Sequence, residues 1–356
     1  MEIVGGVDTH SAVHCVAAMD GTGRLLATAE FPAQERGYRD LVAWLRGHGT
    51  VRTVGVEGTG AYGAGLARYL MQQGMTVMEV PRPDRRLRRS RGKSDPIDAE
   101  AAARSVVAGT ATILPKIADG PIEALRLLRV ARQGAVKART AAANTLRGLL
   151  VTAPEALRSQ LPRTGSAATL ARTCRRLRPR GNDFSDPTQA AKLALFSVAS
   201  RVSALEDEVR LLDHRIADIV RAAAPATEAL FAFGPQTAGA LLVAVGDNPD
   251  RLRSERALAR LCGAAPIPAS SGKTTRHRLH RGGDRSADRA LHTVVIVRLR
   301  YCPRTRSYVA RRTAEGLSKR EIIRCLKRYL VREVFSPEGV DSVGWEGWGQ
   351  VAEVPR

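Results

Sequence analysis

Alternating apolar and polar positions dominate the first third of the chain and predict a sheet. Five strands are expected, at residues 3–7, 13–19, 25–31, 53–56 and 76–80. The turn Asp20-Gly-Thr-Gly23 is typical of a hairpin between the second and third strands. Helical spacing predicts two helices, at 36–47 and 63–73. A hairpin followed by alternating helices and strands predicts an α/β domain, a mixed sheet with helices on its faces.

Beyond this domain the pattern becomes helical. A helix is expected over 121–150, and residues 152–189, rich in Pro and Gly, are expected to form a broken, partly mobile connection. The clearest periodicity follows, with apolar residues at alternating steps of three and four: Leu195, Val198, Val202, Leu205, Val209, Leu212, Ile216 and Ile219. This heptad pattern predicts a coiled-coil seam in a self-association or helix-hairpin element. The alternative is one amphipathic helix packed on its own domain.

The last third is also expected to be helical. Residues 230–246 are typical of helix, Gly-Pro turn and helix, similar to a helix-hairpin-helix except that Gln236 replaces the usual second glycine. Further helices are expected at 251–262, 290–299 and 319–331, with a loop at 263–288. The fold class is therefore α/β plus all-α. We place the boundaries of the four parts at 1–115, 116–225, 226–335 and, for a tail, 336–356.

Composition adds a strong positive charge. Arg and Lys number 56 against 35 Asp and Glu, a net charge of +21. Residues 251–332 hold 22 of these cations and 5 of the acids, so most of the excess lies there. Nucleic acid is the usual polyanionic partner of such a chain. A membrane is not expected as a partner, since no run of 18 apolar residues and no signal peptide is present.

Cysteine usage indicates a reduced compartment. The five cysteines are scattered and form no C-x-x-C pair. This spacing argues against a disulfide framework and against a structural zinc site. We therefore expect a cytoplasmic, nucleoid-associated protein.

Four carboxylates in the first domain form a candidate metal site. Asp8 and Glu57 each follow an apolar strand, and Asp95 and Asp98 lie three apart at the start of a helix, on one face. Strand ends and a helix that covers them bring such side chains together. Clustered carboxylates are stable around a cation, and hard oxygen ligands favour Mg²⁺. Taken singly, each acid is also typical of a turn, a solvated loop or a helix N-cap.

Two sets of polar residues are candidates for DNA contact. Seven cations precede Asp95 within twelve residues, and phosphate contact explains such a run: Arg82, Arg85, Arg86, Arg88, Arg89, Arg91 and Lys93. In the last third, Ser270 and Ser271 are followed by four cations, Lys273, Arg276, Arg278 and Arg281. Arginines there would neutralise phosphate oxygens while an activated serine attacks. The alternative is a polar turn whose serines satisfy backbone groups.

These motifs resemble a known family. Gly6-Val-Asp8-Thr-His, Val56-Glu57-Gly-Thr-Gly-Ala-Tyr62 and Lys93-Ser-Asp95-Pro-Ile-Asp98-Ala are similar to three blocks of the DEDD transposases of the insertion sequence 110 family, which includes Piv-type invertases. Gly263-Ala-Ala-Pro266 followed by Ser271-Gly272 resembles the signature of its C-terminal domain. The resemblance runs from about residue 3 to 331, except for 152–189.

The resemblance implies both fold and chemistry. The first domain would be RuvC-like, of the ribonuclease-H type, with metal ligands Asp8, Glu57, Asp95 and Asp98. Ser271, or failing that Ser270, would form a 5′-phosphoserine link to DNA, with the acids completing the site from another subunit of a dimer or tetramer. A bridge RNA would pair with donor and target DNA.

Two other functions are open at this point. A RuvC-type nuclease would hydrolyse phosphodiesters with water and would tolerate Ser271→Ala. A non-catalytic nucleic-acid-binding relative would tolerate loss of Asp8 and Glu57. The presence of all four acids argues against the second alternative.

Overall fold

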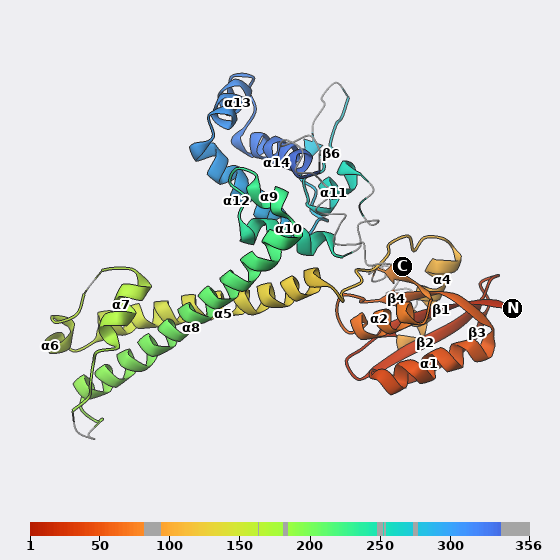
Figure 1. Cartoon of the computed structure of the whole chain (residues 1–356), viewed down its shortest axis with the longest axis horizontal. Helices are drawn as coiled ribbons and strands as arrows, with labels where there is room; N and C mark the ends of the chain where they lie inside the picture. The colour runs from red at the N-terminus through yellow and green to blue at the C-terminus, as the bar shows by residue number, and fades with distance from the viewer. Residues whose placement is uncertain are drawn as a thin grey trace. The chain divides into compact units, whose positions relative to one another are not determined.

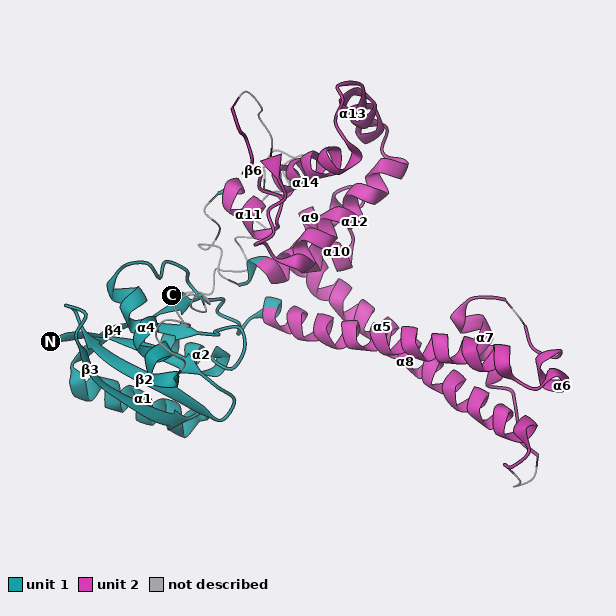
Figure 2. Ribbon diagram, turned by 180° about the vertical axis from the view of Figure 1, so that it is seen from behind, with its two compact units in different colours: residues 1–122, 245–254 teal, residues 123–244, 255–356 magenta. Residues whose placement is uncertain are grey.

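The chain folds into two compact units. The computed structural model describes residues 1–81, 94–162, 164–180, 184–247, 252, 254–272 and 277–335. One unit comprises Met1–Ile122 with Val245–Ser254, and the other comprises Glu123–Ala244 with Glu255–Arg356 (Figure 2). The predicted tail at 336–356 lies outside the described residues.

A mixed five-stranded sheet forms the centre of the first unit. Its strands are β1 (Glu2–Thr9), β2 (Val13–Asp20), β3 (Leu25–Pro32), β4 (Thr50–Glu57) and β5 (Thr76–Val80), in the order β3-β2-β1-β4-β5. β2 pairs antiparallel with β1 and β3, whereas β1, β4 and β5 run parallel. The predicted strands and mixed sheet are confirmed, and the arrangement is consistent with a ribonuclease-H-like domain.

Helices cover both faces of this sheet (Figure 1). On one face, α1 (Glu35–His48) and α2 (Ala64–Gln72) pack on alternate strand residues in an apolar core. Fully buried members of this core are Ile3, Val7, Val16, Leu41, Leu45, Val54, Leu66 and Leu70. On the other face, α4 (Asp95–Val107) contributes small residues, Ala99 and Ala102, to the cores around Cys15 and Val80.

The backbone of α4 lies almost directly on β1 and β4. A Cβ atom at Gly6 would lie 2.2 Å from both Ala103 N and Ala99 O, and one at Gly55 would lie 2.8 Å from Ala102 O. Only glycine at these two positions allows the helix to come so close. The two glycines therefore set the distance between the start of α4 and the carboxyl ends of the two strands.

Two long helices lie side by side and antiparallel in the second unit (Figure 1). They are α5 (Pro121–Thr152), which begins at the end of the first unit, and α8 (Pro187–Ala223). The heptad positions lie on α8, and Leu195, Val202 and Ile216 are fully buried. Arg132 on α5 forms an ion pair with Asp213 on α8. A helix hairpin within one chain therefore accounts for the buried seam, while the coiled coil itself stays a prediction.

The described part of the connection between these helices, residues 153–162, 164–180 and 184–186, includes short helices. It contains α6 (Glu155–Arg158) and α7 (Ala167–Cys174). Leu157, Leu161 and Leu170 are buried in one core with residues of α5 and α8. Burial of these leucines fixes the segment despite its helix breakers.

Short helices and one small hairpin form the rest of the second unit. The elements are α9 (Pro225–Ala229), α10 (Pro235–Val245), α11 (Glu255–Leu261), β6 (Ile267–Pro268), β7 (His277–Arg278), α12 (Arg285–Tyr301), α13 (Pro303–Ala314) and α14 (Lys319–Phe335). The pairing of β6 with β7 corrects the expectation of a plain loop over 263–288, and α13 was not expected. In the first turn of α10, Gln236 Nε2 donates a hydrogen bond to Asp213 Oδ1 (2.6 Å). No described helix combines the length and apolar character needed to cross a membrane.

Because α4 packs so closely on β1, adding one methyl group at Gly6 should lower the stability of the fold. Gly6→Ala places its Cβ against helix backbone, which cannot rotate away, so we expect a loss of about 1–3 kcal/mol or more in unfolding free energy. Gly47→Ala in α1, where a Cβ would meet nothing within 4 Å, should instead stabilise by about 0.4–1 kcal/mol. Hydrogen exchange of β1 and α4 peptides measures the first effect locally, and exchange of α1 peptides measures the second. Equal exchange in the two variants would contradict the close packing.

Candidate metal centre and serine hairpin

Asp8 lies at the carboxyl end of β1, on the face covered by α4. Successive strand residues point to opposite faces, and Asp8 shares its face with Gly6, which contacts α4. His10 follows two residues later. Its Nε2 lies 3.3 Å from Asp8 Oδ2 and 3.3 Å from Asp95 Oδ1. Ligand atoms of Asp8, His10 and Asp95 all lie within 4.8 Å of one another.

The start of α4 brings the second pair of carboxylates to this edge. Ser94 occupies the N-cap position, and its carbonyl oxygen accepts hydrogen bonds from the amides of Ile97 and Asp98, both 3.1 Å. Pro96 suits the first turn of a helix because it lacks an amide proton. The Asp95 side chain is 45% exposed, whereas Asp98 is buried. The carboxylate of Asp95 is therefore open to solvent, whereas that of Asp98 lies inside the protein.

Glu57 lies at the equivalent end of the neighbouring parallel strand. β1 and β4 are in register with Val7 opposite Val56, and Glu57 shares the face of Gly55, which contacts α4. The side chain of Glu57 is buried, and the backbone carbonyl oxygen of Glu57 accepts a hydrogen bond from Thr9 Oγ1 (2.8 Å). Glu57 thus lies on the same face and at the same edge of the sheet as Asp8.

Electrostatics within the cluster favour a cation. Burial raises the pKa of the Asp8 carboxyl, and the charges of Asp98 and Asp95 raise it further, while His10 lowers it. Buried carboxylates at close range destabilise one another unless positive charge offsets them. The donor set of carboxylate oxygens fits a hard divalent ion, and His10 adds a nitrogen donor that softer ions accept. These residues therefore fit a divalent metal site.

Sequence reasoning missed His10. The signal was present in the spacing, because residues two apart at a strand end lie on one face, and Asp8 and His10 are two apart. The structure brings His10 together with Asp8 and Asp95, places the charge of Asp98 close enough to raise the pKa of Asp8, and places Glu57 on the adjacent strand.

The candidate serines lie in the loop between β6 and β7. Ser270 and Ser271 are both exposed. The base of this hairpin is closed by two glycines, since a Cβ at Gly283 would lie 2.3 Å from Gly263 N. Gly263 itself has φ +67°, a conformation that favours glycine. The serines are therefore presented on a loop whose ends are fixed.

The cations expected to contact DNA divide into two groups. Arg278 lies in β7 and Arg281 follows it, and both are exposed. The others lie outside the described residues: Arg82, Arg85, Arg86, Arg88, Arg89, Arg91, Lys93, Lys273 and Arg276. The carboxylates belong to the first unit and Ser271 to the second.

Comparison with known proteins places both sites in one family. Residues 5–153 match the model of the transposase family named for DEDD and IS110, and residues 227–310 match the transposase family IS116/IS110/IS902. The chain is 28% identical over 319 residues to a Streptomyces coelicolor protein named for the IS117 mini-circle, to which a transposase function is ascribed, covering 75% of this chain and 77% of that protein.

A second relative supports the same assignment. The chain is 31% identical over 144 residues to a 43.6 kDa protein of insertion element IS110 from the same species, covering 39% of this chain and 35% of that protein. The first family match contains Asp8, Glu57, Asp95 and Asp98, and the second contains Ser271. The chain belongs to the IS110 family of transposases, enzymes that recombine DNA.

Proposed function

We propose that this transposase cuts and rejoins the DNA of an insertion sequence through a phosphoserine intermediate, with Mg²⁺ held by its acidic cluster. The observation that carries this proposal is the convergence of Asp8, His10 and Asp95, with Asp98 near enough to raise the pKa of Asp8. Two of the four acids that the family resemblance singled out, Asp8 and Asp95, belong to this group, which supports the proposal. The catalytic domain is taken as residues 1–115 and the serine-bearing domain as 226–335.

Asp8, Glu57, Asp95 and Asp98 are the proposed metal ligands. When bound, Mg²⁺ would supply positive charge to the oxygens of the reacting phosphodiester. The buried side chains of Asp8, Glu57 and Asp98 fix the inner side of the site. Asp95 and His10, both about half exposed, leave the outer side open to a phosphate. His10 also balances the charge of the carboxylates that flank it.

Ser271 is the proposed nucleophile, with Ser270 as the alternative. Its Oγ would form a bond to the phosphorus of DNA while the bond from phosphorus to the 3′-oxygen breaks. The serine hydroxyl proton leaves, and the 3′-oxygen departs as a hydroxyl. Arg278 and Arg281 would offset the charge that develops on the phosphate oxygens.

The proposal also includes partners. A bridge RNA that pairs with donor and target DNA would bind the basic parts of the chain, and the subunits would act as a dimer or tetramer in the cytoplasm, on the nucleoid. The coiled-coil seam of α8 would support such assembly if it exchanged partners between subunits. The competing function is a metal-dependent nuclease that uses water in place of Ser271.

Metal binding can be tested by thermal unfolding. Mg²⁺ or Mn²⁺ at 100 times its dissociation constant should stabilise the protein by about 2.7 kcal/mol, because the folded state alone presents the gathered ligands. Asp8→Asn and Asp95→Asn should abolish this shift and lower strand transfer about 100-fold or more, since even outer partners of metal ligands contribute about 10- to 100-fold. Asp40→Asn, an exposed carboxylate on α1, is the matched control. A full metal shift in Asp8→Asn would rule out the site.

The raised pKa of Asp8 predicts a pH dependence in EDTA. The folded state keeps a proton on this carboxyl at higher pH than the unfolded state does, so the carboxyl's contribution to stability declines as pH rises above 3.8 through the raised pKa. Asp8→Asn should therefore stabilise the metal-free protein at pH 7, and this gain should shrink towards pH 4. Urea unfolding of both proteins across this range measures the difference. A gain that is constant with pH would contradict the assignment.

Substitution of the serines separates the two candidate chemistries. Ser271→Ala should eliminate the covalent protein–DNA adduct on denaturing gels and lower strand transfer about 10³-fold or more, as for other nucleophilic serines. Ser270→Ala should retain both, and each variant should keep the metal-dependent thermal shift. Full cleavage by Ser271→Ala with no adduct in either protein would favour the water-using nuclease.

A further inference from the structure

We propose that a cavity between α13, α14 and the β6–β7 hairpin binds one unpaired nucleotide, its base against Tyr329 and Tyr308 and its phosphates on the surrounding arginines. The inference rests on the proposed function, since it assumes a nucleic-acid substrate. The cavity has a volume of about 720 Å³ and lies entirely within the second unit. Sites for small molecules are typically of this size.

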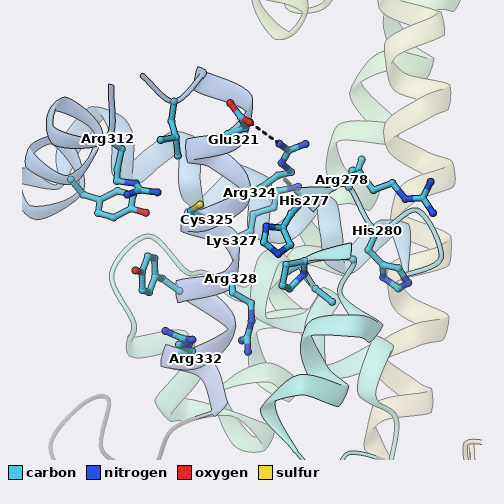
Figure 3. Close-up of a pocket in the computed structure, with 18 of the residues that line it drawn as sticks. His277, Arg278, His280, Arg312, Glu321, Arg324, Cys325, Lys327, Arg328 and Arg332 are labelled. Atoms are coloured by element: carbon cyan, nitrogen blue, oxygen red, sulfur yellow. Dashed lines mark ion pairs between the residues drawn. The ribbon is translucent and has the colours of Figure 1, made fainter. Parts of the chain in front are cut away.

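The walls of the cavity are strongly basic. Figure 3 shows cations of α14 together with Arg312 of α13 and residues of β7 and beyond; the Arg and Lys residues of the lining are Arg278, Arg311, Arg312, Arg324, Lys327, Arg328 and Arg332. α14 lies outside both segments that match the family models. The cations therefore need an explanation of their own.

Acidic side chains of the protein pair with these cations but do not neutralise all of them. Glu255 is shared by Arg328 and Arg332, and Glu315 by Arg311 and Arg312. Lys327 Nζ lies 2.7 Å from Asp288 Oδ1, and Arg324 NH2 only 3.8 Å from Glu321 Oε1. Four carboxylates thus pair with six of the seven cations, and positive charges exceed negative ones by three among these described residues. An anion with several oxygens, such as a phosphodiester, would complete these pairs.

Two buried nitrogens in the lining also lack partners. Neither His280 Nδ1 nor Arg312 Nε makes a hydrogen bond to any described residue. A buried polar atom left unpaired costs about 1–3 kcal/mol, so such atoms indicate a bound water or ligand. Both residues line the cavity, but these two atoms are closed to solvent, so a ligand would reach them only after the side chains turn.

An aromatic wall argues for a base in addition to a phosphate. Tyr308 and Tyr329 pack edge to face with ring centroids 5.5 Å apart, and Tyr329 is 45% exposed. Leu279, also 45% exposed, and Leu317 extend this apolar part. Burial and the neighbouring Cys325 raise the pKa of Tyr308 to about 12, so its hydroxyl keeps its proton. A guanidinium already lies over each ring, Arg311 at 5.4 Å from the centroid of Tyr308 and Arg332 at 5.5 Å from that of Tyr329. A nucleobase would stack on the exposed part of Tyr329 that these contacts leave open.

The ligand should be unpaired because a duplex hides the faces of its bases. Aromatic side chains reach a base only after it leaves the stack, or when the strand is single. Duplex DNA would meet the arginines through its backbone and gain nothing from Tyr329. Affinity for single strands should therefore depend on the tyrosine ring, and affinity for duplexes should not.

The test uses fluorescence anisotropy with the full chain in EDTA. Tyr329→Ala should weaken binding of a 12-nucleotide single strand about 5- to 150-fold, the effect of one stacked base, and leave duplex affinity unchanged. Tyr329→Phe should bind like the parent protein because it keeps the ring. Tyr301→Ala, a 59% exposed tyrosine outside the cavity lining, is the matched control. DNA and RNA strands of one sequence show which of the two the cavity prefers.

A charge variant completes the design. Arg324→Gln should weaken binding and reduce the salt slope by about one, whereas Arg320→Gln, on the same helix but outside the lining, should not. If Tyr329→Ala has no effect, or weakens single strands and duplexes equally, the nucleotide site is refuted. EDTA removes strand transfer, so failure of the proposed metal or serine chemistry would leave this outcome unaffected.

Discussion

The contact between α4 and the strands β1 and β4 is the constraint on which the candidate metal site depends. Gly6 and Gly55 let the helix backbone touch the sheet, so that the first turn of α4 reaches the carboxyl ends of β1 and β4. A larger residue at either position would push Asp95 and Asp98 away from Asp8. The convergence of the acids is therefore a property of backbone packing, before any metal is considered.

That convergence opposes stability in the absence of a cation. Asp8 is buried, two other acids raise its pKa further, and among the described residues His10 lowers it. Burial makes such repulsion stronger than it would be at the surface. A bound cation would attract these carboxylates. The residues that destabilise the metal-free fold would therefore stabilise the metal-bound fold. Electrostatic strain of this kind is characteristic of functional sites.

Periodicity and strand ends made much of this arrangement predictable from the sequence. The five strands and the helices on the sheet follow from apolar spacing. Asp95-Pro96 indicated the start of α4, although the N-cap is Ser94, one residue before the acid that the sequence suggested. The features that the sequence did not predict have no periodic pattern of apolar residues. α13 buries only Thr305 among the residues of its helix, so its polar sequence shows no apolar face. The basic cavity combines three separated segments, a proximity that only the tertiary fold creates.

The two halves of the proposed chemistry differ in the charges that they carry. The chain from Ala264 to Arg281 contains Ser270 and Ser271 with cations and two histidines, but no Asp or Glu. A serine there has neighbours that stabilise a negative transition state and no carboxylate neighbour in its own hairpin to hold a metal ion. The proposed metal ligands lie in the first unit and the proposed nucleophile lies in the second. The proposed chemistry therefore draws on the acids of one unit and on the serine and arginines of the other.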